Sequence, residues 1–439
     1  MTVELAHPST EPSPSRSPVE PAHPRWWFAR TTPGRILTIG VILATLGILS
    51  AFATSTTIND RQQQLNTVLN HTEPLAFAAG QLYTTLSVAD AAAATAFIAG
   101  SEPRPVRQRY EQAITDAAVA VTRASSGLTD EPLVEVLGRI NAQLAVYTGL
   151  IETARTNNRM GNPVGSSYLS EASALMQQSI LPEAQRLYEE TSARVDAETT
   201  ASTRIPAPVI VVVITTLAFG AFAHRWLAGR TRRRVNVGLV VGGFAIVVMI
   251  IWVGTALTIS TAGSRSAKNT AAESLKTVTN LAITAQQARA DETLSLIRRG
   301  DEDVRKRSYY QRVDTMHQQL TEYLARRDAI DKSDLADADK LLMKWRAADE
   351  RINAYIAVGN YQAATQVALG TGEDDSTPAF DKLDEALSNG IQESRNQLRN
   401  DILSARRVLS GATVGGVVLS VGAALAVALG LWPRLSEYR

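Results

Sequence analysis

Four long runs of apolar residues divide the chain, and none of them contains a charged residue. They are Ile36–Asn59, Ile205–Ala223, Val235–Gly263 and Leu409–Trp432. Each holds about the 20 residues that an α-helix needs, at a rise of about 1.5 Å per residue, to cross roughly 30 Å of hydrocarbon. The sequence therefore predicts four transmembrane helices, over residues 35–58, 205–223, 235–263 and 408–432.

Two long segments, residues 59–204 and 264–407, alternate with these runs and have a different pattern. They are rich in Ala, Leu, Gln, Glu, Arg and Thr, which favour helices, and Gly and Pro interrupt them about every 30 residues. The interruptions are Gly100–Pro103, Gly127–Asp130, Gly161–Pro163, Gly300–Asp301, Asp331–Ser333 and Gly359–Pro378. Within the last of them, Gly370–Pro378 resembles an ordered-to-flexible loop. Short connections place successive helices antiparallel. We therefore expect an all-α membrane protein with two tandem extracytoplasmic four-helix bundles.

Arginines beside the apolar runs predict the orientation. They gather in the tail 1–34, the loop 224–234 and the end 433–439, and short basic segments stay in the cytoplasm. Together with Arg35 these segments carry a net charge of +7, whereas the two long segments carry −6. We therefore expect a multi-pass plasma-membrane protein with both termini inside and both bundles outside. The whole-chain charge of +1 gives no basis for a nucleic-acid partner.

The two halves of the chain repeat each other at an offset of 198 residues. The matching pairs are Arg35–Gly40 with Arg233–Gly238, Val106–Arg109 with Val304–Arg307, and Gly161-Asn162 with Gly359-Asn360. Since repetition at a fixed period indicates repeated architecture, we expect an internal duplication of one unit, made of a span, an outside bundle and a second span.

The first apolar run ends in Ala51-Phe52-Ala53, which fits the small-residue pattern of a signal-peptidase site. Cleavage there would leave three spans. The third run cannot be a signal peptide, yet it aligns with the first, so we expect the first helix to be retained.

Two of the repeated motifs lie in turns at the distal tips of the predicted bundles, because the first and third helix of each bundle lead away from the membrane. The candidate partner-binding residues at these tips are Gly100, Arg104, Arg107, Arg109, Gly161, Asn162, Gly165, Arg305, Arg307, Gly359 and Asn360. A structural interpretation competes with this one, since glycine commonly ends a helix and spaced arginines commonly form a solvated face. The loop from Gly161 to Gly165 is shaped by two glycines and a proline, and loops often carry recognition.

Catalytic motifs are absent from the sequence. The chain has no cysteine and only five histidines, and it contains no Gly-rich phosphate loop, nucleophile elbow or H-E-x-x-H motif. We therefore predict no catalytic residue, no metal site and no cofactor, and we do not expect an enzyme. The apolar runs also lack the ionisable residues of carriers and pumps. A receptor remains, with most of its mass outside the membrane.

Little of the chain is available to a partner on the inside. Arg230, Arg232, Arg233 and Arg234 are the candidate cytoplasmic contacts, although anchoring the topology and contacting anionic membrane lipid is the simpler role for them. The tail is rich in proline and is expected to be extended. Small-residue spacing at Gly238–Gly242 and Gly411–Gly415 favours close helix contact, within one chain or in a homodimer.

The tandem layout, the proline-rich tail before Arg25-Trp-Trp-Phe28 and the region from Gly161 to Pro182 resemble the GlnX-type membrane proteins of mycobacteria and related actinobacteria. The resemblance implies two partners. Outside, the amino-acid-binding lipoprotein GlnH docks on the bundles, and inside, the signal reaches PknG, a Ser/Thr kinase that controls glutamate metabolism. It supplies no catalytic residues. Beside this signalling receptor, the sequence leaves a structural or assembly protein of the cell envelope as the alternative.

Overall fold

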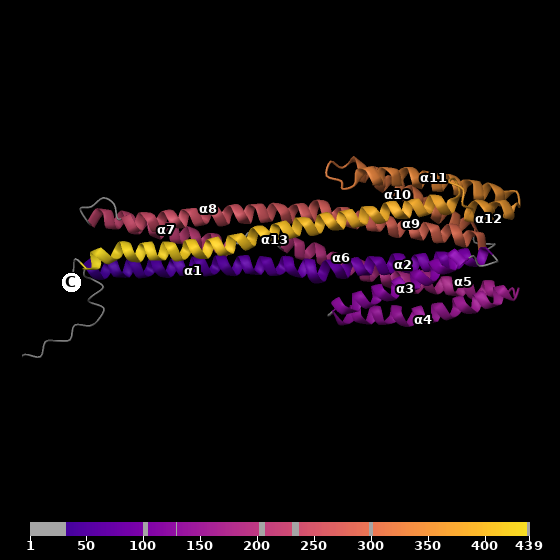
Figure 1. Ribbon diagram of the computed structural model, residues 1–439, viewed down its shortest axis with the longest axis horizontal. Helices are drawn as coiled ribbons and strands as arrows, with labels where there is room; N and C mark the ends of the chain where they lie inside the picture. The colour runs from indigo at the N-terminus through magenta and orange to yellow at the C-terminus, as the bar shows by residue number, and fades with distance from the viewer. Residues whose placement is uncertain are drawn as a thin grey trace, which may run out of the picture. The chain divides into compact units, whose positions relative to one another are not determined.

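The computed structural model describes residues 32–99, 104–128, 130–201, 207–230, 237–297 and 302–436, and every regular element in these ranges is a helix (Figure 1). The first half contains α1 (Thr32–Thr67), η2 (Val68–Thr72), α2 (Glu73–Ile98), α3 (Arg104–Gly127), α4 (Glu131–Arg159), α5 (Gly165–Leu175), η3 (Met176–Ile180) and α6 (Leu181–Ala201). The second half contains α7 (Ala207–Arg230), α8 (Val237–Ser266), η4 (Ala267–Ala272), α9 (Glu273–Ile297), α10 (Glu302–Ala325), α11 (Lys332–Ala357), α12 (Tyr361–Leu369) and α13 (Ser376–Ser436). The segments η2, η3 and η4 are short π-helical turns that continue directly into the next α-helix. For the described residues, the predicted all-α fold class is confirmed.

Four stretches of helix are long and apolar enough to cross a membrane, namely Thr38–Ile98, Val209–Trp226, Gly243–Leu296 and Ser376–Ala423. The four predicted spans lie in α1, α7, α8 and α13, apart from residues 205–206 and 235–236, which are outside the described ranges. Large apolar side chains along these helices are exposed, as is usual for contact with lipid; Phe52, Phe244 and Leu429 are 67%, 68% and 72% exposed. The chain is therefore compatible with a multi-pass membrane protein, while its orientation stays a prediction.

The chain divides into two compact units. One takes in Met1–Phe52, Ile210–Val248 and Val418–Arg439, and the other takes in Ala53–Val209 and Met249–Val417. In the second unit, α8 and α13 pack closely: a Cβ added to Gly263 would lie 3.5 Å from Ala405 Cβ. A Cβ on Gly415 would lie 2.7 Å from Trp252 Nε1, but one on Gly411 would meet nothing within 4 Å. Of the two glycines in the predicted contact face of α13, only Gly415 lies against a neighbouring side chain.

The second unit contains two hydrophobic cores. The first core lies among α2, α3, α4, α5 and α6, and we call residues 68–201 the first module. On α3 the stripe Ala113, Ala117, Ala120 and Ala124 is at most 4% exposed, so small side chains every three to four residues let α3 approach α2 closely. The second core lies among α9, α10, α11 and α13, and we call residues 267–402 the second module. Trp345 is fully buried there and meets Tyr309 and Phe380 edge to face.

The same order of elements occurs in both modules. A π-helical turn precedes α2 and also α9, and α3 and α10 both contain 24 residues. The third helix of each module ends at a glycine with positive φ, Gly161 at +70° and Gly359 at +73°. The breaks predicted at Gly127–Asp130, at Gly161–Pro163 and around Asp331–Ser333 are found where the structure describes them, and those at Gly100–Pro103 and Gly300–Asp301 lie outside the described residues.

The fourth helix of the second module differs from the prediction. A single break was expected from Gly359 to Pro378, with a loop over Gly370–Pro378, but Tyr361–Leu369 is the helix α12, and α13 begins at Ser376. Two hydrogen bonds stabilise the connection between them: Asp375 Oδ2 accepts from the Gly372 backbone amide at 2.8 Å, and Arg351 donates to the Asp374 carbonyl. The non-helical connection is therefore limited to residues 370–375.

Candidate functional site

The glycine–asparagine pairs predicted as recognition residues end helices. After α4 the backbone amide of Asn162 donates to the backbone carbonyl of Asn157 at 2.9 Å, and that of Gly161 donates to the backbone carbonyl of Asn158 at 3.0 Å. After α11 the corresponding bonds run from Asn360 to Tyr355 and from Gly359 to Ile356, each at 2.9 Å. This is the Schellman arrangement, in which the positive φ of the glycine completes the cap.

The two capped turns also shape the module tips. Gly165 is buried, and a Cβ there would lie 3.0 Å from the Ala154 carbonyl oxygen, so this glycine lets α5 start against the end of α4. Asn360 accepts from the Ala363 amide at 3.1 Å and thereby caps α12. The structural role of these residues is therefore established, and their role in partner binding stays a prediction.

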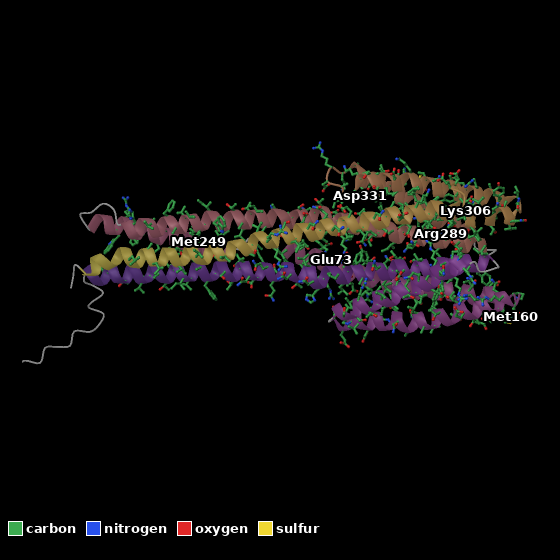
Figure 2. All side chains as sticks on the ribbon, in the orientation of Figure 1. Glu73, Met160, Met249, Arg289, Lys306 and Asp331 are labelled. Carbon is green, nitrogen blue, oxygen red and sulfur yellow. The ribbon has the colours of Figure 1, made fainter. Side chains whose placement is uncertain are left out.

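Apolar side chains are exposed around both capped turns. At the first turn Met160 and Val164 are 62% and 47% exposed, and Figure 2 places Met160 at the end of the first module. At the second turn Tyr355, Val358 and Tyr361 are 39%, 77% and 43% exposed. We call these five side chains the tip surface. Sequence reasoning selected the glycines and missed the apolar residues beside them.

The predicted arginines separate into two groups. Arg104 and Arg107 are exposed, and Arg107 Nε donates to Glu111 on the same helix at 2.7 Å. Arg109 instead forms an ion pair of 2.8 Å with Asp381 of α13, which links the two modules. The structure therefore does not gather these arginines into one site.

The equivalent arginines of the second module also differ from each other. Arg305 is half-buried. Burial raises the pKa of Asp90 in the first module, and the positive charge of Arg305 opposes part of this rise. Arg307 is exposed. Gly100 lies outside the described residues, as do Arg232, Arg233 and Arg234, and nothing is described of the Arg230 side chain.

Charged and polar groups cross the boundary between the modules along α2. Glu73 is 2% exposed and forms ion pairs with Arg395 and Arg399 of α13, the latter at 2.7 Å. The Arg395 guanidinium also lies 3.8 Å from the centre of the Phe77 ring, a cation–π contact. Further along α2, Gln287 of α9 donates to the Tyr83 hydroxyl at 2.6 Å. The modules are thus joined by specific polar contacts in addition to apolar packing.

A cavity of about 240 Å³ lies between the modules. Its walls come from α2, α6, α9 and α13, and most of its lining is apolar. Gly80 leaves room for the walls to approach, because a Cβ there would lie 3.4 Å from the Tyr188 ring and 3.5 Å from Thr279. Polar groups interrupt the lining, among them Glu73, Gln286 and Asp384. A concave, mainly apolar space into which polar groups project is typical of a small-molecule site.

Each module also buries a carboxylate in its core. In the first, Asp90 accepts hydrogen bonds from Gln177 at 2.9 Å, from Ser173 at 3.2 Å and from Tyr147 at 3.4 Å. In the second, Glu292 accepts from Trp345 Nε1 at 3.1 Å and pairs with Arg289. Tyr147 and Trp345 are 198 positions apart, so the aromatic donor occupies the same place in both modules.

Burial raises the pKa of Asp90 to about 6, and the hydrogen bonds from Gln177, Ser173 and Tyr147 offset only part of this effect. The folded chain therefore holds the Asp90 proton up to about pH 6, whereas an unfolded aspartate releases it near 3.8. The stabilising effect of this proton is complete below about pH 4 and is lost as the pH rises through 6. Above that pH, the buried charge destabilises the first module.

Within the described residues, no group of three or more His, Cys, Asp or Glu side chains could hold a metal ion. The candidate site consists of the tip surface, the polar contacts between the modules and the cavity. These features define a helical class of protein, compatible with a multi-pass membrane protein, in which a small cavity lies between two packed modules.

Residues 64–200 match the family model of an actinobacterial sensor domain. The match covers the first module and less than half of the chain. It indicates a sensing protein of the actinobacterial type. A search of the curated proteins and a search of the solved structures gave no match.

Proposed function

We propose that the protein is a transmembrane signalling receptor that senses amino-acid availability. The match of residues 64–200 to a sensor domain carries this proposal. In the proposed arrangement, the modules face outward and arose by duplication of one unit. The common order of their elements and the pair of Schellman caps 198 residues apart support the duplication.

The proposed outside partner is a periplasmic amino-acid-binding lipoprotein of the GlnH type, and the proposed inside partner is a Ser/Thr kinase of the PknG type that controls glutamate metabolism. Both rest on the resemblance of the whole chain to the GlnX-type proteins. The tip surface favours the outer partner, because exposed aromatic and methionine side chains are enriched where proteins dock. The exposed Arg104 at the start of α3 adds a positive charge suited to an acidic partner surface.

The helices offer a physical route for the signal. α1 runs through η2 into α2, α8 runs through η4 into α9, and α13 is continuous over 61 residues. A packed helix transmits a small axial or rotational shift, provided that the ligand favours one arrangement over the other. Docking that alters the packing of α2 against α9 and α13 would reach the predicted spans by this route. The basic loop 224–234 and the two terminal segments are the proposed contacts for the kinase.

Site-specific photocrosslinking in the native membrane tests the docking step. A photoreactive residue at Met160 or Val358 is expected to crosslink to an amino-acid-binding lipoprotein. The matched control is Val119, which is 41% exposed on α3 and lies outside the tip surface. Crosslinks of equal yield from Val119, or none from either tip position, contradict the proposed docking surface.

A helix interruption tests the relay separately. Three glycines inserted between residues 406 and 407 of α13 should abolish the kinase response while the tip crosslinks persist. The control insertion is placed between Gly370 and Thr371, where the helix is already interrupted. A response that survives the first insertion contradicts the relay. An envelope defect that does not depend on amino-acid supply would instead favour a structural role.

A further inference from the structure

One buried acceptor of a residue that lines the cavity lacks a donor among the described residues. Gln286 of α9 is 1% exposed, and its Nε2 donates to Asp384 Oδ1 of α13 at 2.8 Å. Its other amide atom, Oε1, is buried and has no hydrogen-bond partner among the described residues. A buried acceptor without a donor is unfavourable, so Gln286 Oε1 would be stabilised by a ligand that donates a hydrogen bond to it.

Asp384 makes the same side of the cavity negative. Burial raises the pKa of this carboxyl, and the Gln286 amide and the charge of Arg109 counteract the effect only in part. Arg109 itself is paired with Asp381, and Asp384 makes no ion pair in the described part of the chain. The other carboxylates of the lining have cationic neighbours: Glu73 has Arg395 and Arg399, and Asp196 has Lys276 at 4.0 Å.

The rest of the wall suits an aliphatic group. Phe77, Leu275 and Ile391 line the cavity, and its volume of about 240 Å³ exceeds the roughly 150 Å³ that accommodates benzene in an engineered protein cavity. The space is therefore large enough for an organic molecule of five or six heavy atoms. Such a ligand needs hydrogen-bond donors and a positive charge at one end.

We propose that the cavity between the modules binds a small organic primary ammonium ion, with its NH3⁺ group at Gln286 Oε1 and Asp384 and its aliphatic part against the apolar wall. The ammonium supplies the donor that Gln286 Oε1 lacks and the charge that Asp384 lacks. This direct ligand site goes beyond the proposed function, in which a separate protein recognises the amino acid. Binding at the cavity does not require docking at the tips, so the two proposals fail separately.

Calorimetric titration of the full-length protein in lipid nanodiscs tests the proposal, with empty nanodiscs as the blank. The probes share one carbon skeleton: 3-methylbutylamine, the neutral 3-methylbutan-1-ol, and leucine, which adds an α-carboxylate to the amine. The amine is expected to bind at pH 7.5 at least about 10-fold more tightly than the alcohol, the factor that corresponds to one charge-assisted hydrogen bond. If leucine binds more tightly than the amine, the natural ligand is an amino acid, and if the amine binds more tightly, it is a simple amine.

Two variants locate the site. Asp384→Asn removes the charge without changing the shape, and Gln286→Met removes the free acceptor, so each should weaken amine binding roughly 10- to 100-fold. Asp196→Asn is the matched control, because Asp196 also lines the cavity but already lies near Lys276, and its affinity should stay within about 3-fold of the wild type. Melting curves check that the variants fold.

Three results overturn the proposal: no saturable binding of amine or leucine to the wild type, equal affinity for amine and alcohol, or unchanged amine affinity in a folded Asp384→Asn protein. If Asp384→Asn does not fold, the comparison of amine with alcohol on the wild type decides.

Discussion

Replacing Glu73 by Gln tests whether the modules are held together by a buried ion pair. Glu73 is 2% exposed, and its partners Arg395 and Arg399 are 22% and 36% exposed. The substitution keeps the shape and one acceptor oxygen but removes the negative charge. Two arginines of α13 are then left beside an apolar wall without their counter-ion.

The expected cost follows from this burial. Removing one partner of a fully buried pair costs about 3–5 kcal/mol. Water reaches both arginines in part and recovers some of their solvation, so we expect Glu73→Gln to lower the free energy of unfolding by about 2–3 kcal/mol. That corresponds to a roughly 30-fold or greater increase in the unfolded fraction.

Urea unfolding of the full-length protein in detergent measures this cost. Circular dichroism follows all helices. Trp345 is the only tryptophan in the two modules, so fluorescence follows the second core once the other five tryptophans of the chain are replaced by Phe in every variant. The midpoint should fall with an unchanged slope, which indicates lower stability and not a different unfolded state. Glu190→Gln is the matched control, since Glu190 pairs with Arg186 on the same exposed helix face, and its effect should stay below about 0.5 kcal/mol.

A double-mutant cycle completes this test. Glu73→Gln combined with Arg399→Gln should cost at least about 1 kcal/mol less than the sum of the single substitutions, because the two side chains are in contact. Additive costs, or a Glu73→Gln effect no larger than that of Glu190→Gln, would refute the interpretation of Glu73 as a connection between the modules.

Three further predictions use the same unfolding assay. Asp90→Asn should stabilise the protein above pH 6, where burial of the charge costs up to about 3 kcal/mol, and this advantage should disappear near pH 4; a constant difference across this range contradicts the raised pKa. Gly161→Ala should cost about 1–2 kcal/mol because φ is +70°, whereas Gly149→Ala, in an open helical position, should stabilise by up to about 1 kcal/mol; equal effects contradict the cap. Arg109→Gln should cost less than about 1 kcal/mol, because Arg109 and Asp381 are 41% and 42% exposed, and a larger loss contradicts the solvated pair.

Helix positions could be predicted from the sequence because local chemistry determines them. The spans are visible as runs without charge, and Gly161 and Gly359 mark helix ends because only glycine readily takes the positive φ of a Schellman cap. The break predicted from Gly359 to Pro378 was too long. Its middle forms the helix α12, and the non-helical part is residues 370–375, where Arg351 and Asp375 make hydrogen bonds that the local pattern does not reveal.

The cavity and its charges could not be predicted from the sequence, because the partners are distant in the chain. Glu73 and Arg395 are 322 residues apart, and Gln286 and Asp384 are 98 apart. One signal was available: α2 spans 26 residues and Glu73 and Asp90 are its only charged residues. An acid in a helix that is otherwise so apolar is either buried with a partner or functional. Periodicity alone does not identify the partner.

The π-helical turns η2 and η4 lie where the cavity meets the helices that lead to the predicted spans. Glu73 directly follows η2, and Ala272, the last residue of η4, lines the cavity. Arg399 of α13 contacts the junction between η2 and α2. Its Nη1 donates to Glu73 at 2.7 Å and to the Leu69 carbonyl of η2 at 3.2 Å. π-Helical turns are rare and occur frequently at functional sites.

A ligand that changes the spacing of α2 and α13 therefore acts on η2, the segment that connects α1 to α2. The prediction is specific: with 3-methylbutylamine bound, amide hydrogen exchange should slow in residues 68–72 and 267–272 of the full-length protein. The exposed helix turns around Val119 serve as the internal control and should not change. Equal protection of the π-helical turns and of the control residues around Val119 would indicate general stabilisation. The π-helical turns would then have no special part in the response.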